Sequence, residues 1–134
     1  MNTKLKNLHR KYIHLTNKLS KVAKRNTFLG EVPKLKGLKS KRVYISTWCL
    51  KHLYDKRTAV EYEYIVEYLS MVLKFPDNIY TNLPNRQGDL VLHRRLKDGD
   101  YIAIVETAKK SGNTNHVLTS FRIKKKDMKR FNKV

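Results

Sequence analysis

The chain has 134 residues, which suits one domain with a modest hydrophobic core. Its formal net charge of +19 is far outside the usual range and calls for a polyanionic partner, with nucleic acid first and an anionic membrane second. The single cysteine, Cys49, excludes an internal disulfide and a cysteine-rich zinc site. No signal peptide and no membrane-spanning apolar run are seen, so we expect a soluble, cytoplasmic protein without membrane contacts.

The positive charge is concentrated at the two ends of the chain. Residues 1–42 carry 13 Lys and Arg against 1 acid, and residues 121–134 carry 7 against 1. Residues 43–120 are almost neutral, with 10 against 9. We therefore predict a basic amphipathic helix and linker over residues 1–41, a folded domain over residues 42–123 and a basic tail over residues 124–134.

The first predicted helix covers residues 3–25, where apolar residues recur at spacings of three and four along one face. Docking of this helix on the domain is the favoured interpretation. A coiled-coil dimer and a helix lying on a membrane surface are the two alternatives. Residues 28–40 contain Gly30, Pro33 and Gly37 and are predicted to form a basic linker.

Two further helices are predicted after residue 42. The short apolar run over residues 42–45 is either a strand or the lead into a helix over residues 46–57, which Ser46 or Thr47 can cap. The next helix covers residues 59–74 and ends before Pro76, because the residue before a proline is pushed out of helical geometry.

Strands are predicted for the remainder of the domain. The candidate strands are residues 79–83, 89–96, 101–107 and 116–123, and the third is expected to be central. Their short connections favour antiparallel neighbours. The predicted fold class is therefore α+β, with N-terminal helices followed by a four-stranded antiparallel β-sheet. In the tail, Met128 and Phe131 are expected to touch the domain.

The motifs exclude several kinds of chemistry. His9 and His14 lie five residues apart, outside the spacing at which two helix positions share a metal ion, and no other histidine has a suitable partner. Neither a phosphate-binding loop nor a Ser-His-Asp arrangement is present. Asp98 and Asp100 flank Gly99 and are interpreted as turn residues. We expect no metal ion and no cofactor.

The remaining polar residues suit RNA cleavage without a metal. That reaction needs a group that accepts the proton of the ribose 2′-hydroxyl, a proton donor for the leaving oxygen, and cations around the phosphorus. His52 lies among cationic neighbours and can exchange a proton near neutral pH. Strand alternation puts Arg94 and Arg95 on opposite faces, and likewise Thr119 and Ser120, but does not choose between the members of either pair.

Residues 42–123 resemble the phage-associated nucleases of the barnase, EndoU, colicin and RelE-like superfamily. The resemblance rests on Val43-Tyr-Ile-Ser-x-x-x-Leu-x-His52, on Phe75-Pro-Asp-Asn-Ile79 and on Val117-Leu-Thr-Ser-Phe121. It implies a fold of one or two helices followed by a four-stranded antiparallel sheet, and a metal-independent ribonuclease activity. The helix histidine would be His52, the strand cation Arg94 or Arg95, and the hydroxyl Thr119, with Ser120 beside it.

One departure from that superfamily concerns the second histidine that relatives often carry soon after the first. Here Lys56-Arg57 stands at that place. We nevertheless expect an RNA endonuclease that forms a 2′,3′-cyclic phosphate. His52 would act as base or acid, Arg57 with Arg94 or Arg95 would stabilise the phosphorane, and Thr119 would donate a hydrogen bond.

RNA is the favoured nucleic acid over DNA, and one set of cations is predicted to bind it: Lys51, Lys56, Lys109, Lys110, Arg122, Lys124 and Lys125. Two alternatives stay open. One is a phage accessory protein that binds nucleic acid without cleaving it, which the missing second histidine favours. The other is a toxin whose basic surface is masked by an inhibitor or antitoxin protein.

Overall fold

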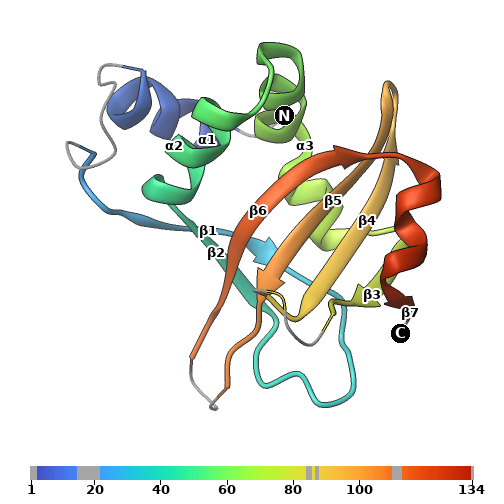
Figure 1. Cartoon of the computed structure of the whole chain (residues 1–134). Helices are drawn as coiled ribbons and strands as arrows, with labels where there is room; N and C mark the ends of the chain where they lie inside the picture. Colours follow the sequence, from blue (N-terminus) through green and yellow to red (C-terminus); the bar gives the residue numbers. More distant parts are fainter. Residues whose placement is uncertain (1–2, 15–21, 84–85, 87, 110–112, 134) are drawn as a thin grey trace.

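The protein is an α+β domain in which the helices within residues 3–74 pack on one face of a twisted sheet (Figure 1). The computed structural model describes residues 3–14, 22–83, 86, 88–109 and 113–133. Its helices are α1 (Thr3–Leu8), the π-helix η1 (His9–Ile13), α2 (Thr47–Lys56), α3 (Ala59–Lys74) and the 3-10 helix η3 (Lys125–Arg130). Its strands are β1 (Asn26–Glu31), β2 (Arg42–Ser46), β3 (Asn78–Thr81), β4 (Leu90–Leu96), β5 (Gly99–Glu106), β6 (Asn115–Ile123) and β7 (Asn132–Lys133).

The sheet is mixed, and its strand order is β1-β2-β6-β5-β4-β3-β7. All neighbouring strands are antiparallel except β2 and β6, which run parallel over a short stretch. The prediction of a four-stranded antiparallel sheet preceded by all the helices is therefore wrong. Six main strands form the sheet, and β1 and β2 come before α2 and α3 in the chain.

The error arose at the N-terminal side of the chain. The predicted helix over residues 3–25 is helical only from Thr3 to Ile13 among the described residues, because residues 22–25 are irregular and residues 15–21 lie outside the description. Strand β1 then begins directly after the predicted helix and includes the first four residues of the predicted linker, residues 28–31. Its pairing with β2 contains a register shift between Phe28 and Gly30, where Gly30 has φ of 147°.

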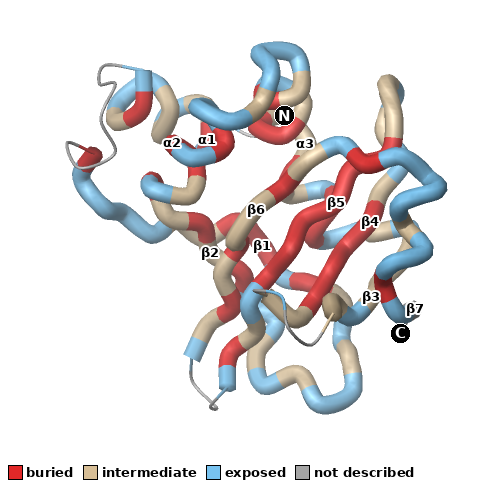
Figure 2. Tube along the Cα trace, in the orientation of Figure 1, coloured by how far each residue is buried: buried red, intermediate tan, exposed pale blue. Residues whose placement is uncertain are grey.

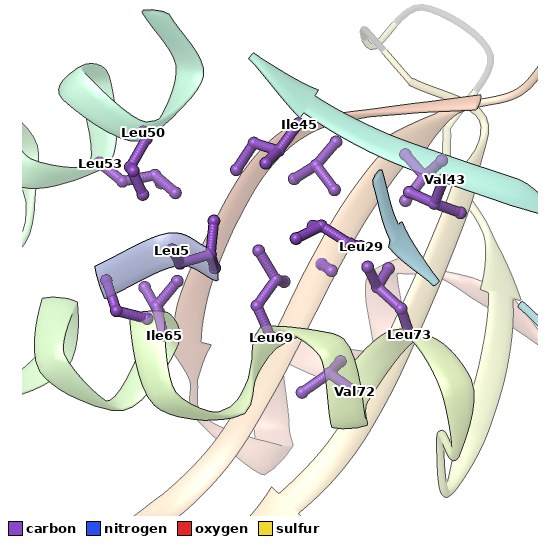
Figure 3. Packing of buried hydrophobic residues seen from close by; sticks show 14 of the residues in the cluster. Leu5, Leu29, Val43, Ile45, Leu50, Leu53, Ile65, Leu69, Val72 and Leu73 are labelled. Atoms are coloured by element: carbon purple, nitrogen blue, oxygen red, sulfur yellow. The ribbon is translucent and has the colours of Figure 1, made fainter. Parts of the chain in front are cut away.

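The main core lies between the helices and one face of the sheet (Figure 3). Figure 3 shows Leu5 of α1, Leu50 of α2 and Leu69 of α3 pointing toward Ile45 of β2 and Leu29 of β1. All five side chains are buried. Because α1 and β1 contribute to this core, these two elements before residue 42 pack as part of the same folded body.

The opposite face of the sheet carries a second, smaller core. Val91 of β4, Ile102 of β5 and Ile123 of β6 pack there with Phe131 and Met128 of the tail. The predicted contact of the tail with the domain is thus confirmed, since Phe131 is buried. The central strands are buried on both faces, as Figure 2 shows for β4 and β5.

A bulge in β6 alters which side chains share a face. The pairing of β5 with β6 shifts between Ile104, which is opposite Thr119, and Val105, which is opposite Val117. Val117 therefore packs in the main core, whereas Phe121 packs against the second one. Regular alternation would place Thr119 and Val117 on the same face, and the bulge is the reason that it does not.

The N-terminal helices dock on α2 and α3 through an aromatic cluster. His9 Nδ1 lies 2.9 Å from the hydroxyl of Tyr62. Its ring also contacts the rings of Tyr54 and His14. Burial lowers the pKa of His9 below its ordinary value, and the positive charges of His14 and Lys51 lower it further.

We predict that acid weakens this docking. The unfolded chain binds a proton at His9 more readily than the folded one, so stability falls as the pH drops below about 6.5. His9→Gln should therefore lose less stability than the wild type between about pH 7.5 and about pH 5.5. Thermal unfolding midpoints measured at both pH values test this difference, and equal losses in the two proteins would contradict it.

Candidate functional site

The candidate site lies along β6, beyond the point where its pairing with β2 ends. Strand β2 pairs with β6 only at Asn115 and His116, so over residues 117–123 none of the described strands lies beside β6 on that side. Its backbone groups are bonded by side chains of α2 and α3 instead. Cys49 Sγ donates to the carbonyl oxygen of Leu118 at 3.5 Å, and Arg57 Nε donates to that of Ser120 at 3.0 Å. The amide of Arg122 donates to Glu61 at 2.9 Å.

Local sequence explains why α2 ends beside this edge. The hydroxyl of Ser46 accepts a hydrogen bond from the amide of Cys49 and so caps the start of α2, as predicted. Leu53 is fully buried and holds the helix against the core. Arg57 then adopts an extended conformation as C-cap, and Thr58 caps α3. The side chain of Arg57 is thereby aimed across the edge of β6.

The structure brings two of the predicted catalytic residues into contact. Arg57 Nη2 donates a hydrogen bond of 2.9 Å to the hydroxyl of Thr119. The guanidinium of Arg57 also lies 5.5 Å from the ring centre of Phe121, and that of Arg130 lies 6.0 Å from it on the same ring. A hydroxyl and two cations thus surround a half-buried aromatic ring, which is an arrangement suited to a phosphate and an adjoining base.

His52 is exposed on the helix that carries Arg57. None of the described residues forms a hydrogen bond or an ion pair with its imidazole. Helical spacing puts it on the same side of α2 as Cys49 and Lys56, and Cys49 contacts β6. Burial raises the pKa of the Cys49 thiol to about 12, so the thiol stays protonated near neutral pH.

The other predicted catalytic residues have structural partners elsewhere. Arg94 donates to the carbonyl oxygen of Phe75 and lies 4.0 Å from Asp77. Arg95 pairs with Asp100 at 2.7 Å. The hydroxyl of Ser120 is buried and donates to the carbonyl oxygen of Ile102 within the sheet. None of these three side chains is bonded to Arg57 or Thr119.

The residues predicted to contact nucleic acid differ in their exposure and in whether they already pair with an acid. Lys51 is the clear correction, because its side chain is only 2% exposed and its ammonium pairs with Asp55 at 2.8 Å. Lys109 is exposed but pairs with Asp89, and Arg122 pairs with Asp98. Lys110 lies outside the described residues. The remaining predicted contacts are exposed: Lys56, Lys124 and Lys125.

Sequence reasoning missed a polar cluster on the second face of the sheet. His93 Nε2 lies 2.9 Å from Asp100, whose other oxygen binds Arg95. Burial alone would raise the pKa of Asp100, but the hydrogen bonds from His93 and Arg95 outweigh it and hold the pKa below its usual value. We had assigned Asp100 to a turn, whereas it is the second residue of β5. A tight turn that pairs Leu96 with Gly99 also places Arg95 opposite Asp100. This short turn was the sequence signal that could have predicted their contact.

Two kinds of site are not found in the part of the chain that the structure describes. No group of three or more His, Cys, Asp or Glu residues there is placed to hold a metal ion. No helix there is long and apolar enough to cross a membrane.

Comparisons with known proteins give no independent assignment. Neither the models of protein families, nor curated proteins, nor solved structures contain a match to this chain. The resemblance to phage-associated nucleases therefore rests on the short motifs alone.

We predict that Glu61 protects the open edge of β6. Glu61→Ala removes the acceptor of the Arg122 amide, so that amide should exchange its hydrogen faster, and the protein should lose about 1 kcal/mol of stability. Hydrogen exchange followed by NMR and urea unfolding measure the two effects. Glu63→Ala is the matched control, because Glu63 is exposed on the same helix and is not bonded to β6. Equal exchange rates at Arg122 in both variants would rule out this role.

Proposed function

We propose that the protein is a metal-independent RNA endonuclease whose products end in a 2′,3′-cyclic phosphate. The observation that supports this most is the hydrogen bond from Arg57 to Thr119, beside Phe121 and on the helix that carries the exposed His52. A titratable imidazole, a fixed cation and a hydroxyl are the three kinds of group that this reaction uses.

The proposed reaction is a transesterification. The neutral imidazole of His52 accepts the proton of the ribose 2′-hydroxyl, and the 2′-oxygen forms a new bond to phosphorus. The bond between phosphorus and the 5′-oxygen breaks, and a water molecule protonates that oxygen to give a 5′-hydroxyl. The hydroxide that remains takes the proton from the imidazolium of His52, so water and the neutral base are both restored. The guanidinium of Arg57 stabilises the negative charge on the non-bridging oxygens, and Thr119 hydrogen-bonds to one of them.

RNA is the substrate class that this surface suits best. Cleavage through a cyclic phosphate requires the 2′-hydroxyl, which DNA lacks. Arg130, Lys124 and Lys125 are exposed in the segment that follows β6, and the guanidinium of Arg130 lies over the ring of Phe121. Their charges would hold the phosphates of a single strand while a base stacks on the aromatic ring.

We predict that His52→Ala abolishes cleavage while leaving RNA affinity nearly unchanged. Loss of a general base lowers the rate by at least about a hundredfold, whereas an uncharged exposed side chain contributes little to phosphate binding. The assay follows mixed RNA in EDTA and detects cyclic phosphate ends; His14→Ala, another exposed histidine, is the control. Cleavage that persists in His52→Ala, or that depends on added divalent metal, would refute the assignment.

We also predict that binding is steeply salt-dependent. Lys124→Gln and Lys125→Gln should each lower the slope of log affinity against log salt by about 1, because each removes one phosphate contact. Fluorescence anisotropy with a labelled oligoribonucleotide measures this slope. Lys74→Gln is the control, since Lys74 is exposed at the end of α3 and outside the predicted contact set. Equal slopes in all proteins would show that the tail does not bind phosphate.

A binding protein without turnover is the second candidate function. The observation that favours it is the engagement of Arg94 and Arg95 by protein groups, together with Lys56 and Arg57 at the place of a second histidine. In that case wild type and His52→Ala would bind RNA equally and neither would produce fragments.

A further inference from the structure

A cavity of about 870 Å³ adjoins the candidate site on the helix side of the sheet. It lies between the N-terminal helices, the end of α2 and the first half of α3. Its size is in the range of pockets that hold a small organic molecule. Arg57 lines this cavity and also binds Thr119, so the cavity and the proposed catalytic groups share one side chain.

The walls of this cavity are rich in aromatic rings. Tyr54, Tyr62, Tyr64 and Tyr68 all line it. Tyr54 is 41% exposed, and Tyr68 is half-buried. The rings are held by one another, because Tyr54 packs edge-on against Tyr62 at 5.2 Å and Tyr64 stacks on the buried Tyr101 at 5.9 Å. Fixed aromatic faces of this kind stack on the flat face of a nucleobase.

Charged groups at the same cavity can bind the polar edge of a base. Lys6 and Glu67 neutralise each other at 2.7 Å, so they add little net charge. Glu63 is exposed and, among the described residues, has no hydrogen-bond or ion-pair partner for its carboxylate. Among the described residues, Arg10 donates only to Asn7, within its own segment. The carboxylate of Glu63 and the guanidinium of Arg10 are therefore available beside the aromatic walls, as a hydrogen-bond acceptor and a donor.

We infer that this cavity is a nucleobase-binding subsite for the nucleotide next to the scissile phosphate. Tyr68 and Tyr54 would stack on the base, and Glu63 would accept hydrogen bonds from its edge. Arg57 would join the base site to the phosphate held at Thr119. The inference rests on the proposed function for its placement along the RNA, but base binding itself does not require cleavage.

Binding is tested with the His52→Ala protein and the four nucleoside 3′-monophosphates, followed by NMR of the backbone amides. Amides of the first half of α3 should shift, and one nucleotide should bind at least about tenfold more tightly than the weakest. Tyr68→Ala should weaken that nucleotide by about tenfold, as loss of one stacking ring does. Glu63→Gln, an exposed substitution that does not threaten folding, should reduce the difference among the bases.

Phe75→Ala is the matched control, because Phe75 is 65% exposed just beyond α3 and does not line the cavity. Unmoved amides in α3, or unchanged nucleotide affinity in both Tyr68→Ala and Glu63→Gln, would overturn the inference. The two proposals fail separately. Cleavage that persists in His52→Ala would refute the catalytic assignment even where nucleotides bind, and cleavage without any effect of Tyr68 or Glu63 on binding would refute the base site alone.

Discussion

The structure depends on how the unpaired edge of β6 is closed. Buried backbone amides and carbonyls need hydrogen-bond partners, and β2 supplies them only at the start of β6. Beyond that point Cys49, Arg57 and Glu61 take the place of a strand. The closure fixes the end of α2 and the start of α3 against the sheet. It also prevents the exposed edge from pairing with another chain.

Because it closes this edge, Arg57 has both a structural role and a proposed functional role, and sequence patterns alone do not connect the two. Its Nε bonds the backbone of β6, and its Nη2 bonds the hydroxyl of Thr119. A guanidinium can do both because its five donors point in fixed directions in one plane. A lysine at this place would have one ammonium for both partners. The same rigidity would let an arginine anchored to the backbone present a fixed positive charge to a bound phosphate.

Much of the local structure follows from the sequence, whereas its assembly does not. The helix over residues 59–74 was predicted correctly, and Ser46 is one of the two capping residues that the sequence predicted, because period and capping are local signals. Strand β1 was missed because its six residues include Gly30 and gain their partner only from β2. The choice between Arg94 and Arg95 as the catalytic cation also needed tertiary information. Alternation shows which side chains of one strand share a face, but only the fold shows that Arg95 forms an ion pair with Asp100.

The arrangement of charge supports a polyanionic partner more strongly than the net charge does. Among the described residues, seven of the eleven acids pair with cations of the chain itself: Asp55, Glu61, Glu67, Asp77, Asp89, Asp98 and Asp100. All seven lie in the almost neutral middle of the sequence, and of these only Glu67 and Asp98 pair with cations of the two ends, namely Lys6 and Arg122. Most of the described cations at the two ends therefore have no acidic partner among the described residues. Exposed cations held this close together repel one another, and the repulsion opposes folding. A phosphate backbone along β6 and the tail would relieve it, which makes binding favourable before any base is recognised.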